Sequence, residues 1–218
     1  MPFKIVPGRD RKLNRLVKKG ATRELRRGQA LYRAGDPGGE VYLVTSGLLL
    51  LTAQYGGRTE RTVDLAGPME LAGEEGLVPG AHRWTNARAE TSSQVVALEG
   101  KAVAQTLQTA TRTFHAFLQG REGAIDLARI PGIPRSSGGA RGRLAAVLLH
   151  LAGRFGQEEE GGVRIPVRLT HQILADLSAS HRSTVTTLLN DWIYDEVLEG
   201  RGKELWIMNP KALTAHLG

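Results

Sequence analysis

The 218-residue chain contains no cysteine. Disulfides, thiolate zinc sites, cysteine-ligated iron–sulfur clusters and cysteine nucleophiles all need that residue, so the sequence excludes them together. Aromatic residues make up only 5% of the chain, and the longest apolar runs, 48–51 and 144–148, are too short to span a bilayer. The first twenty residues are basic and lack the apolar segment of a signal peptide. We therefore expect a soluble cytoplasmic protein that does not partner a membrane.

Sequence signatures of catalysis are also missing. The chain has no G-x-S-x-G elbow, P-loop, H-E-x-x-H motif or dinucleotide fingerprint. Its six histidines show no metal-ligand spacing, and the adjacent carboxylates Glu74 and Glu75 lie in a glycine-rich turn where neighbouring side chains diverge. We predict that the protein is not an enzyme, with no catalytic residues and no metal site.

The formal net charge of +7 is unevenly placed. Residues 1–20 carry seven basic side chains and one acidic side chain, whereas residues 164–218 carry six of each sign. Bulk charge bears on association rather than on fold. We interpret the basic N-terminal arm as a solvated tail, with an accessory DNA or partner contact as the alternative.

Residues 22–98 show short apolar stretches separated by turn signals. Strands are expected over 41–44, 48–53, 59–65, 88–91 and 94–98, with a dense turn cluster at 34–39 and a hairpin at Gly56-Gly57. Many short strands at this spacing are typical of a β-sandwich or barrel of the jelly-roll kind.

The apolar period changes after residue 110. Apolar residues at mostly helical steps predict a helix between residues 111 and 130, long enough for a helix pair across a dimer axis. Pro131, Pro134 and the run 136–139 interrupt it and mark a hinge. A second helix is expected over 141–154, with four residues on one apolar face: Leu144, Val147, Leu148 and Leu151.

Residues 169–192 carry the most specific pattern in the chain. Thr170 is a good N-cap for a short helix whose inward residues are Ile173, Leu174 and Leu177. After a turn at 178–180, Ser180 or His181 caps a second helix, which we expect to bury Val185, Leu188, Leu189 and Ile193. The turn has Ala179 where such turns often have glycine, at a cost of ~1 kcal/mol if its backbone is left-handed. A β-hairpin wing is predicted over 197–208, so the segment indicates a winged helix-turn-helix.

The second helix has an outer face that suits DNA. Arginine can donate two hydrogen bonds to guanine in the major groove, and serine or threonine can serve several base edges. Residues near helix starts are positioned to bind phosphates. Those residues are Thr170, His171, Gln172 and Thr184.

Four segments of the chain share a pattern with a known family: Arg26-Arg27-Gly28 with Leu31-Tyr32, 34–37, 41–47, and 73–77 with Arg83. In these segments the chain resembles the Crp/Fnr family of transcription regulators. Residues 180–189 are also similar to the recognition helix of the cyanobacterial global nitrogen regulators. The resemblance covers residues 20–210 and implies an α+β protein: an N-terminal cyclic-nucleotide-binding-type β-barrel (jelly roll), a dimerisation helix and a C-terminal winged helix-turn-helix.

The resemblance also implies domains, partners and roles. The expected domains are a sensing barrel with the basic arm (1–110), a dimerisation helix and hinge (111–138) and a DNA-binding domain (139–218). A homodimer would bind a pseudo-palindromic promoter site and engage RNA polymerase. By motif, base-reading residues are Arg182, Ser183 and Thr187, and phosphate-binding residues are Thr170, His171, Gln172, Thr184 and Lys203.

Residues 73–85 resemble the family's phosphate-binding cassette. The candidate effector-binding residues are Gly73, Glu74, Gly76, Leu77, Arg83 and Thr85. Trp84 departs from the family pattern, in which a small hydroxyl residue follows the arginine, and it could fill or reshape the pocket. Three alternatives stay open: cyclic AMP or a related nucleotide, another small anion such as a 2-oxo acid, or an empty cassette in an effector-independent regulator. No cofactor is required in any of them, and a nucleotide-binding module without specific DNA binding is the remaining alternative.

Overall fold

The computed structural model describes residues 11–55, 59–109 and 139–217. These residues fall into two compact units, 11–109 and 139–217, which are described separately. The predicted helix over 111–130 and the hinge with Pro131 and Pro134 lie outside the described residues.

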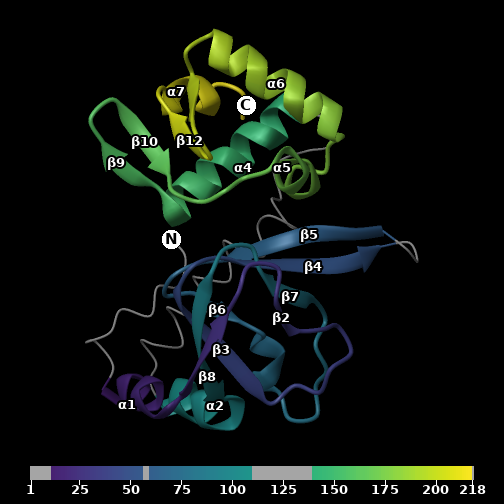
Figure 1. Cartoon of the computed structure of the whole chain (residues 1–218), viewed down its shortest axis with the longest axis vertical. Coiled ribbons are helices and arrows are strands. Elements are labelled where there is room, and N and C mark those ends of the chain that lie inside the picture. The colour runs from purple at the N-terminus through teal and green to yellow at the C-terminus, as the bar shows by residue number, and fades with distance from the viewer. Residues whose placement is uncertain (1–10, 56–58, 110–138, 218) are drawn as a thin grey trace. The chain divides into compact units, whose positions relative to one another are not determined.

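The first unit is built on two four-stranded sheets, and every strand pair is antiparallel (Figure 1). One sheet has the order β1-β8-β3-β6 and consists of β1 (Ala21–Leu25), β8 (Ser93–Glu99), β3 (Glu40–Ser46) and β6 (Leu71–Ala72). The other has the order β2-β7-β4-β5 and consists of β2 (Ala30–Tyr32), β7 (Asn86–Ala89), β4 (Leu49–Tyr55) and β5 (Thr59–Ala66). This jelly-roll-type sandwich confirms the predicted fold class for the first unit.

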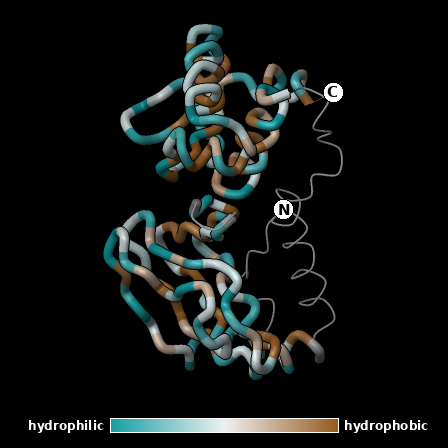
Figure 2. The backbone as a smooth tube through the Cα atoms, turned by 90° about the vertical axis from the view of Figure 1, so that its right-hand side faces the viewer, coloured by the Kyte–Doolittle hydropathy of each residue, from teal (hydrophilic) through white to brown (hydrophobic). Residues whose placement is uncertain are grey.

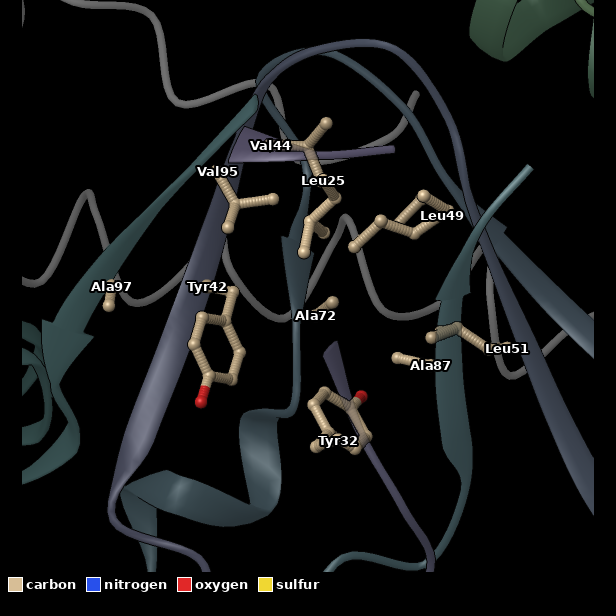
Figure 3. Close-up of a cluster of buried hydrophobic side chains, with 12 residues drawn as sticks. Leu25, Tyr32, Tyr42, Val44, Leu49, Leu51, Ala72, Ala87, Val95 and Ala97 are labelled. Atoms are coloured by element: carbon tan, nitrogen blue, oxygen red, sulfur yellow. The ribbon is translucent and has the colours of Figure 1, made fainter. Parts of the chain in front are cut away.

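Alternation along the strands divides the interior into two cores. Successive strand residues point to opposite faces, so Tyr42 and Val44 of β3 enter the core between the sheets while Leu43 faces the other side. Figure 3 shows the first core, with Val44 and Leu25 at one end and Tyr32 and Tyr42 at the other. The two tyrosine rings stack with centroids 5.8 Å apart.

Two helices belong to the second core of this unit. Helix α2 (Gly100–Thr109) contributes Val103 and Leu107, and helix α1 (Arg11–Lys19) packs Leu16 and Val17 against the same cluster. The interpretation of the whole basic arm as a solvated tail is therefore wrong for residues 11–19. Two adjacent apolar residues are enough to hold one face of this basic helix on the unit, while Lys18 and Lys19 stay in solvent.

The second unit combines helices with a small sheet (Figure 1). The helices are α4 (Gly139–Phe155), α5 (His171–Leu177), α6 (Arg182–Tyr194) and α7 (Pro210–Thr214). The sheet has the order β11-β12-β10-β9, with β9 (Gln157–Glu159), β10 (Gly162–Ile165), β11 (Leu198–Arg201) and β12 (Glu204–Ile207). The four apolar residues predicted on one face of α4 are all buried, and β11 and β12 form the predicted wing.

The predicted buried face of α6 needs one correction. Val185, Leu188 and Leu189 are buried, but Ile193 is 43% exposed and Trp192 is 1% exposed. At 3.6 residues per turn, residue 192 continues the stripe through 185 and 188, whereas residue 193 lies at its margin.

Hydrophobic residues occur in short stretches within both units (Figure 2). Among the described residues, no helix has the length and apolar character needed to cross a membrane.

Candidate nucleic-acid interface and anion cassette

The helix-turn-helix is fixed by backbone contacts around its turn. The Thr170 hydroxyl accepts a hydrogen bond from the Ile173 N–H at 3.2 Å, which confirms Thr170 as the N-cap of α5. Ala179 has a φ of 47°, so its backbone is left-handed, which is the conformation in which alanine at this position costs stability. The Ser180 N–H donates to the Ala175 carbonyl at 2.9 Å, and Nε of Arg143 on α4 donates to the Ser178 carbonyl at 2.8 Å. These bonds set the angle at which α6 leaves the turn.

Helix α6 presents its predicted base-reading residues to solvent. It begins at Arg182, after His181 as N-cap, and the three residues Arg182, Ser183 and Thr187 are exposed. The Thr187 hydroxyl donates to the Ser183 carbonyl at 3.2 Å and keeps its lone pairs available. Among the described residues, no ion-pair or hydrogen-bond partner holds the Arg182 guanidinium. The helix therefore offers an uncommitted five-donor group at its first turn.

The predicted phosphate-binding residues divide into two groups. Thr170, His171 and Lys203 line one groove of about 340 Å³ between α5, α6 and the β11–β12 turn. Gln172 and Thr184 do not line it; Nε2 of Gln172 donates to Asp176 at 2.9 Å instead.

A contact between α5 and α6 orients one groove residue, and the groove includes one basic residue, Arg168, that the sequence analysis did not select. Nδ1 of His171 lies 2.8 Å from the Thr186 hydroxyl, which ties α5 to α6. Arg168 and Asn190 also line the groove. Arg168 comes two residues before the N-cap of α5, and its basic charge at that place is the signal that would have found it.

Arg201 also lies in the wing, where its guanidinium already has partners. Its guanidinium pairs with Glu199 at 2.7 Å and lies 4.0 Å from the centre of the Trp206 ring. The hydrogen bond from Arg201 lowers the pKa of the exposed Glu199 carboxyl. Lys203 is exposed at the tip of the wing and has no such partner among the described residues.

In the first unit, the cassette forms around the buried side chain of Arg83. This residue is only 4% exposed. Its Nη1 donates to the Gly73 carbonyl at 2.6 Å and its Nη2 donates to the Glu40 carbonyl at 2.7 Å. The guanidinium carbon lies 4.5 Å and 5.3 Å from the ring centres of Tyr32 and Tyr42, the two tyrosines at one end of the core in Figure 3. Burial is the main cause that raises the pKa of the Tyr32 hydroxyl.

Two glycines shape the turn that carries this arginine's partners. Gly73 has a φ of 77° and immediately precedes the 3₁₀ helix η1 (Glu74–Leu77). A Cβ at Gly73 would collide with the Arg83 guanidinium, and a Cβ at Gly76 would collide with the Glu40 carbonyl. The close approach of η1 to β3 and Arg83 therefore requires glycine at both positions.

A carboxylate that the motif reading did not select also enters the cassette. Glu75 is 8% exposed, and its Oε2 lies 3.7 Å from Nη1 of Arg83. Its Oε1 accepts a hydrogen bond from the peptide N–H of Trp84 at 3.0 Å. The signal in the sequence was a second carboxylate directly after Glu74, within the segment 73–85 that resembles the phosphate-binding cassette.

The other predicted cassette residues have different surroundings. Leu77 packs against the second core, while Glu74 and Thr85 are half-buried. Trp84 is 74% exposed, so the expectation that its indole could fill the pocket is wrong. Its side chain leaves the site while its peptide N–H stays in it. Among the described residues, no group of three or more carboxylates and histidines is placed to hold a metal ion.

A jelly-roll-type sandwich with a buried arginine cassette, on the same chain as a winged helix-turn-helix, defines a DNA-binding transcription regulator that carries its own sensor-type domain. Comparison with known proteins agrees. Residues 22–110 match the cyclic nucleotide-binding domain and residues 142–216 match the Crp-like helix-turn-helix domain.

Individual proteins give the same result. The chain is 30% identical over 168 residues to a cyclic AMP receptor protein of Thermus thermophilus, an alignment of 75% of this chain and 72% of that one. It is 28% identical over 193 residues to the global nitrogen regulator of Synechococcus elongatus, over 88% and 87% of the two chains. A solved CRP/FNR-family regulator from Thermus thermophilus superposes with a TM-score of 0.68 at 26% identity, over 90% of this chain and 98% of that one. The chain belongs to the Crp/Fnr family of transcription regulators, which are not enzymes.

Proposed function

We propose that the protein binds DNA as a homodimer, with α6 of each protomer in successive major grooves of a pseudo-palindromic promoter site. The observation that carries this proposal is the exposed first turn of α6 with the uncommitted Arg182 guanidinium. An α-helix fits the major groove, and two-fold symmetry places the two half-sites ~34–36 Å apart. Arg182 would read a guanine, and Ser183 and Thr187 would contact neighbouring base edges.

Phosphate contacts would fix the orientation of α6 on DNA. We assign them to five residues at the start of α5, in the first turn of α6 and in the wing: Thr170, His171, Gln172, Thr184 and Lys203. Because residues 164–218 carry six basic and six acidic side chains, these placed groups rather than a broad basic field must supply the attraction. A small number of phosphate contacts gives a moderate dependence of affinity on salt.

The remaining assignments follow from the family. Residues 111–138 would supply the dimerisation helix and hinge between the sensor domain (1–110) and the DNA-binding domain (139–218), and RNA polymerase would be the protein partner at promoters. The cassette residues that would face an effector are Gly73, Glu74, Gly76, Leu77, Arg83 and Thr85. Cyclic AMP appears in the name of the Thermus relative but not in that of the Synechococcus relative. The buried carboxylate beside Arg83 favours the effector-independent alternative for this chain.

In vitro selection of binding sites from a random duplex library tests the DNA proposal. We expect the full chain to enrich two-fold-symmetric sites whose half-sites are one helical turn apart. The same selection with Arg182→Ala should retain the symmetry and lose the preference at one position of each half-site. Binding that is independent of sequence and disappears at moderate salt would overturn the proposal.

A further inference from the structure

In the sensor-type domain, the carboxylate of Glu75 lies next to the buried guanidinium of Arg83. Among the residues of the first unit whose burial is described, 14–54 and 60–107, Arg83 is the only buried lysine or arginine. Glu40 accepts a hydrogen bond from Arg83 only through its backbone carbonyl, because its side-chain carboxylate is paired with Arg23 at 2.8 Å. The carboxylate of Glu75 lies 3.7 Å from the guanidinium, so it supplies the negative charge that a buried arginine needs.

Glu75 lies against two groups that an incoming anion would need, a cationic side chain and a backbone N–H. A small anion in a protein is held by a cationic side chain together with free backbone N–H groups. In this cassette the cation is Arg83 and the N–H belongs to Trp84, and Glu75 faces both of them. Its Oε1 accepts from the N–H, and its Oε2 lies 3.7 Å from Nη1 of Arg83 as an ionic neighbour without a hydrogen bond. Among the described residues Nε of Arg83 has no hydrogen-bond partner, so Glu75 compensates the charge of the guanidinium rather than its last donor.

The local charge also opposes a second anion. Arg83 and Glu75 carry opposite charges 3.7 Å apart, and Glu74, the first residue of η1, adds a second carboxylate next to Glu75 in the chain. A cyclic phosphate would therefore bring a net negative charge to a largely buried site with no uncompensated cation. Such a transfer is strongly unfavourable.

The backbone keeps Glu75 in this position. It lies in the middle of η1, between Gly73, whose left-handed φ starts the 3₁₀ turn, and Gly76, which packs on the Glu40 carbonyl. Because these close approaches leave η1 little room to move, the carboxylate is part of the folded cassette rather than a group on a free loop.

We propose that Glu75 is a built-in counter-ion that takes the place of an effector's phosphate, so that the cassette excludes cyclic nucleotides and the regulator binds DNA without them. The second half of this statement rests on the proposed function. The first half concerns ligand binding alone and can be tested on the protein without DNA.

The test measures cyclic AMP binding to the full-length chain and two variants by calorimetry and by thermal shift. We expect no heat and no thermal shift for the wild type at cyclic AMP concentrations up to ~1 mM. Glu75→Gln removes the charge but keeps an oxygen that accepts from the Trp84 N–H, and Glu75→Leu removes both. Both variants leave Arg83 uncompensated, so we expect at least ~30-fold tighter binding of cyclic AMP than the wild type shows, with a rise in melting temperature on ligand addition.

Glu90→Gln is the matched control. Glu90 is another buried carboxylate of the same unit, 5% exposed, but the side chains of its partners Arg27 and Arg88 are 59% and 44% exposed. Removing its charge leaves no buried guanidinium, so this variant should gain no cyclic AMP binding. If it gains as much as Glu75→Gln, the effect is not specific to the cassette and the proposal fails.

Two further outcomes would overturn the proposal. One is micromolar binding of cyclic AMP to the wild type. The other is folded Glu75→Gln and Glu75→Leu proteins, each with a cooperative melt, that still bind no cyclic AMP. DNA affinity is measured separately on a selected site with and without cyclic AMP. Failure of the wild type to bind any selected site would reject the proposed function and leave the calorimetric result on Glu75 standing.

Discussion

Arg83 in the first unit and Arg182 in the second unit have the same side chain in opposite surroundings. Arg83 is 4% exposed and is held by two carbonyls, two tyrosine rings and the carboxylate of Glu75. Arg182 is exposed at the start of α6 and, in the part of the chain that is described, has no partner. A buried and compensated guanidinium acts as a structural element, whereas an exposed and uncommitted one is ready to bind a ligand. If Glu75 compensates Arg83 as proposed, we expect ligand binding by this regulator to depend on Arg182 rather than on Arg83.

The largest expected effect is the loss of stability in Arg83→Met. The substitution leaves Glu75 buried without a cation and removes the donors of the Gly73 and Glu40 carbonyls. Breaking a buried pair from one side costs ~3–5 kcal/mol. Hydrogen exchange read by mass spectrometry should show faster exchange in peptides from β3 and β8 and unchanged exchange in α4. Arg182→Met is the control and should change stability by less than ~0.5 kcal/mol; equal effects of the two substitutions would remove the contrast between these arginines.

A double variant separates the ion pair from the carbonyl contacts. Replacing both members of a buried pair by apolar residues is often neutral, so Arg83→Met/Glu75→Leu should regain much of the stability that Arg83→Met loses. If the double variant is as unstable as the single one, the carbonyls of Gly73 and Glu40 hold the cassette and the ion pair contributes little.

On the DNA side, Arg182→Ala should weaken binding to the preferred site by ~1–3 kcal/mol and relax the base preference at one position per half-site. The reason is the loss of two donors to a guanine edge. Fluorescence anisotropy with the selected site and single-base variants of it measures both quantities. Unchanged discrimination would show that Arg182 does not read a base.

The sequence predicted the second unit better than the first because its signals are local. The cap at Thr170, the apolar steps of α5 and the glycine-containing turn of the wing each depend on neighbours within a few residues. The predicted burial of Ile193 was wrong because a residue at the margin of an apolar stripe can face either the core or solvent. The adjacent Trp192 is buried instead. Helix α1 was missed because its burial depends on a cluster formed with β3, β8 and α2, which are distant in sequence.

The cassette shows the same limit at the level of single side chains. The motif identified Arg83 and the glycines around η1, because those residue types at that spacing are readable from the chain. The direction of the Glu75 side chain was not readable, since it depends on how η1 packs on β3 through Gly76 and the Glu40 carbonyl. The motif therefore selected Glu74, which is half-buried, whereas the adjacent Glu75 is the glutamate that is buried against the cation.

Lys203→Ala tests a smaller effect on the DNA side. Lys203 lies at the tip of the wing and lines the groove beside α5. As a phosphate contact it carries no sequence information, so its loss should weaken binding about equally for preferred and unrelated sites. The slope of log affinity against log salt should fall by ~1. Anisotropy titrations at several salt concentrations measure the slope, and Lys211→Ala, a lysine that does not line the groove, should leave it unchanged.

The smallest expected effect is on stability, and it concerns the residue that each unit has at a left-handed position of its backbone. The cassette has glycine where its backbone is left-handed, at Gly73 with a φ of 77°, whereas the helix-turn-helix has Ala179 at 47°. A left-handed alanine costs ~1 kcal/mol or more because its Cβ approaches the following carbonyl, and Ala179 is exposed, so its methyl contributes little packing. Ala179→Gly should therefore raise the melting temperature of the second unit by a few degrees and leave DNA affinity unchanged, because α6 keeps its position. Gly73→Ala is the reverse case and should destabilise the first unit, since its Cβ also collides with Arg83. A lower melting temperature for Ala179→Gly would show that the turn gains more from a restricted unfolded chain than it loses to left-handed strain.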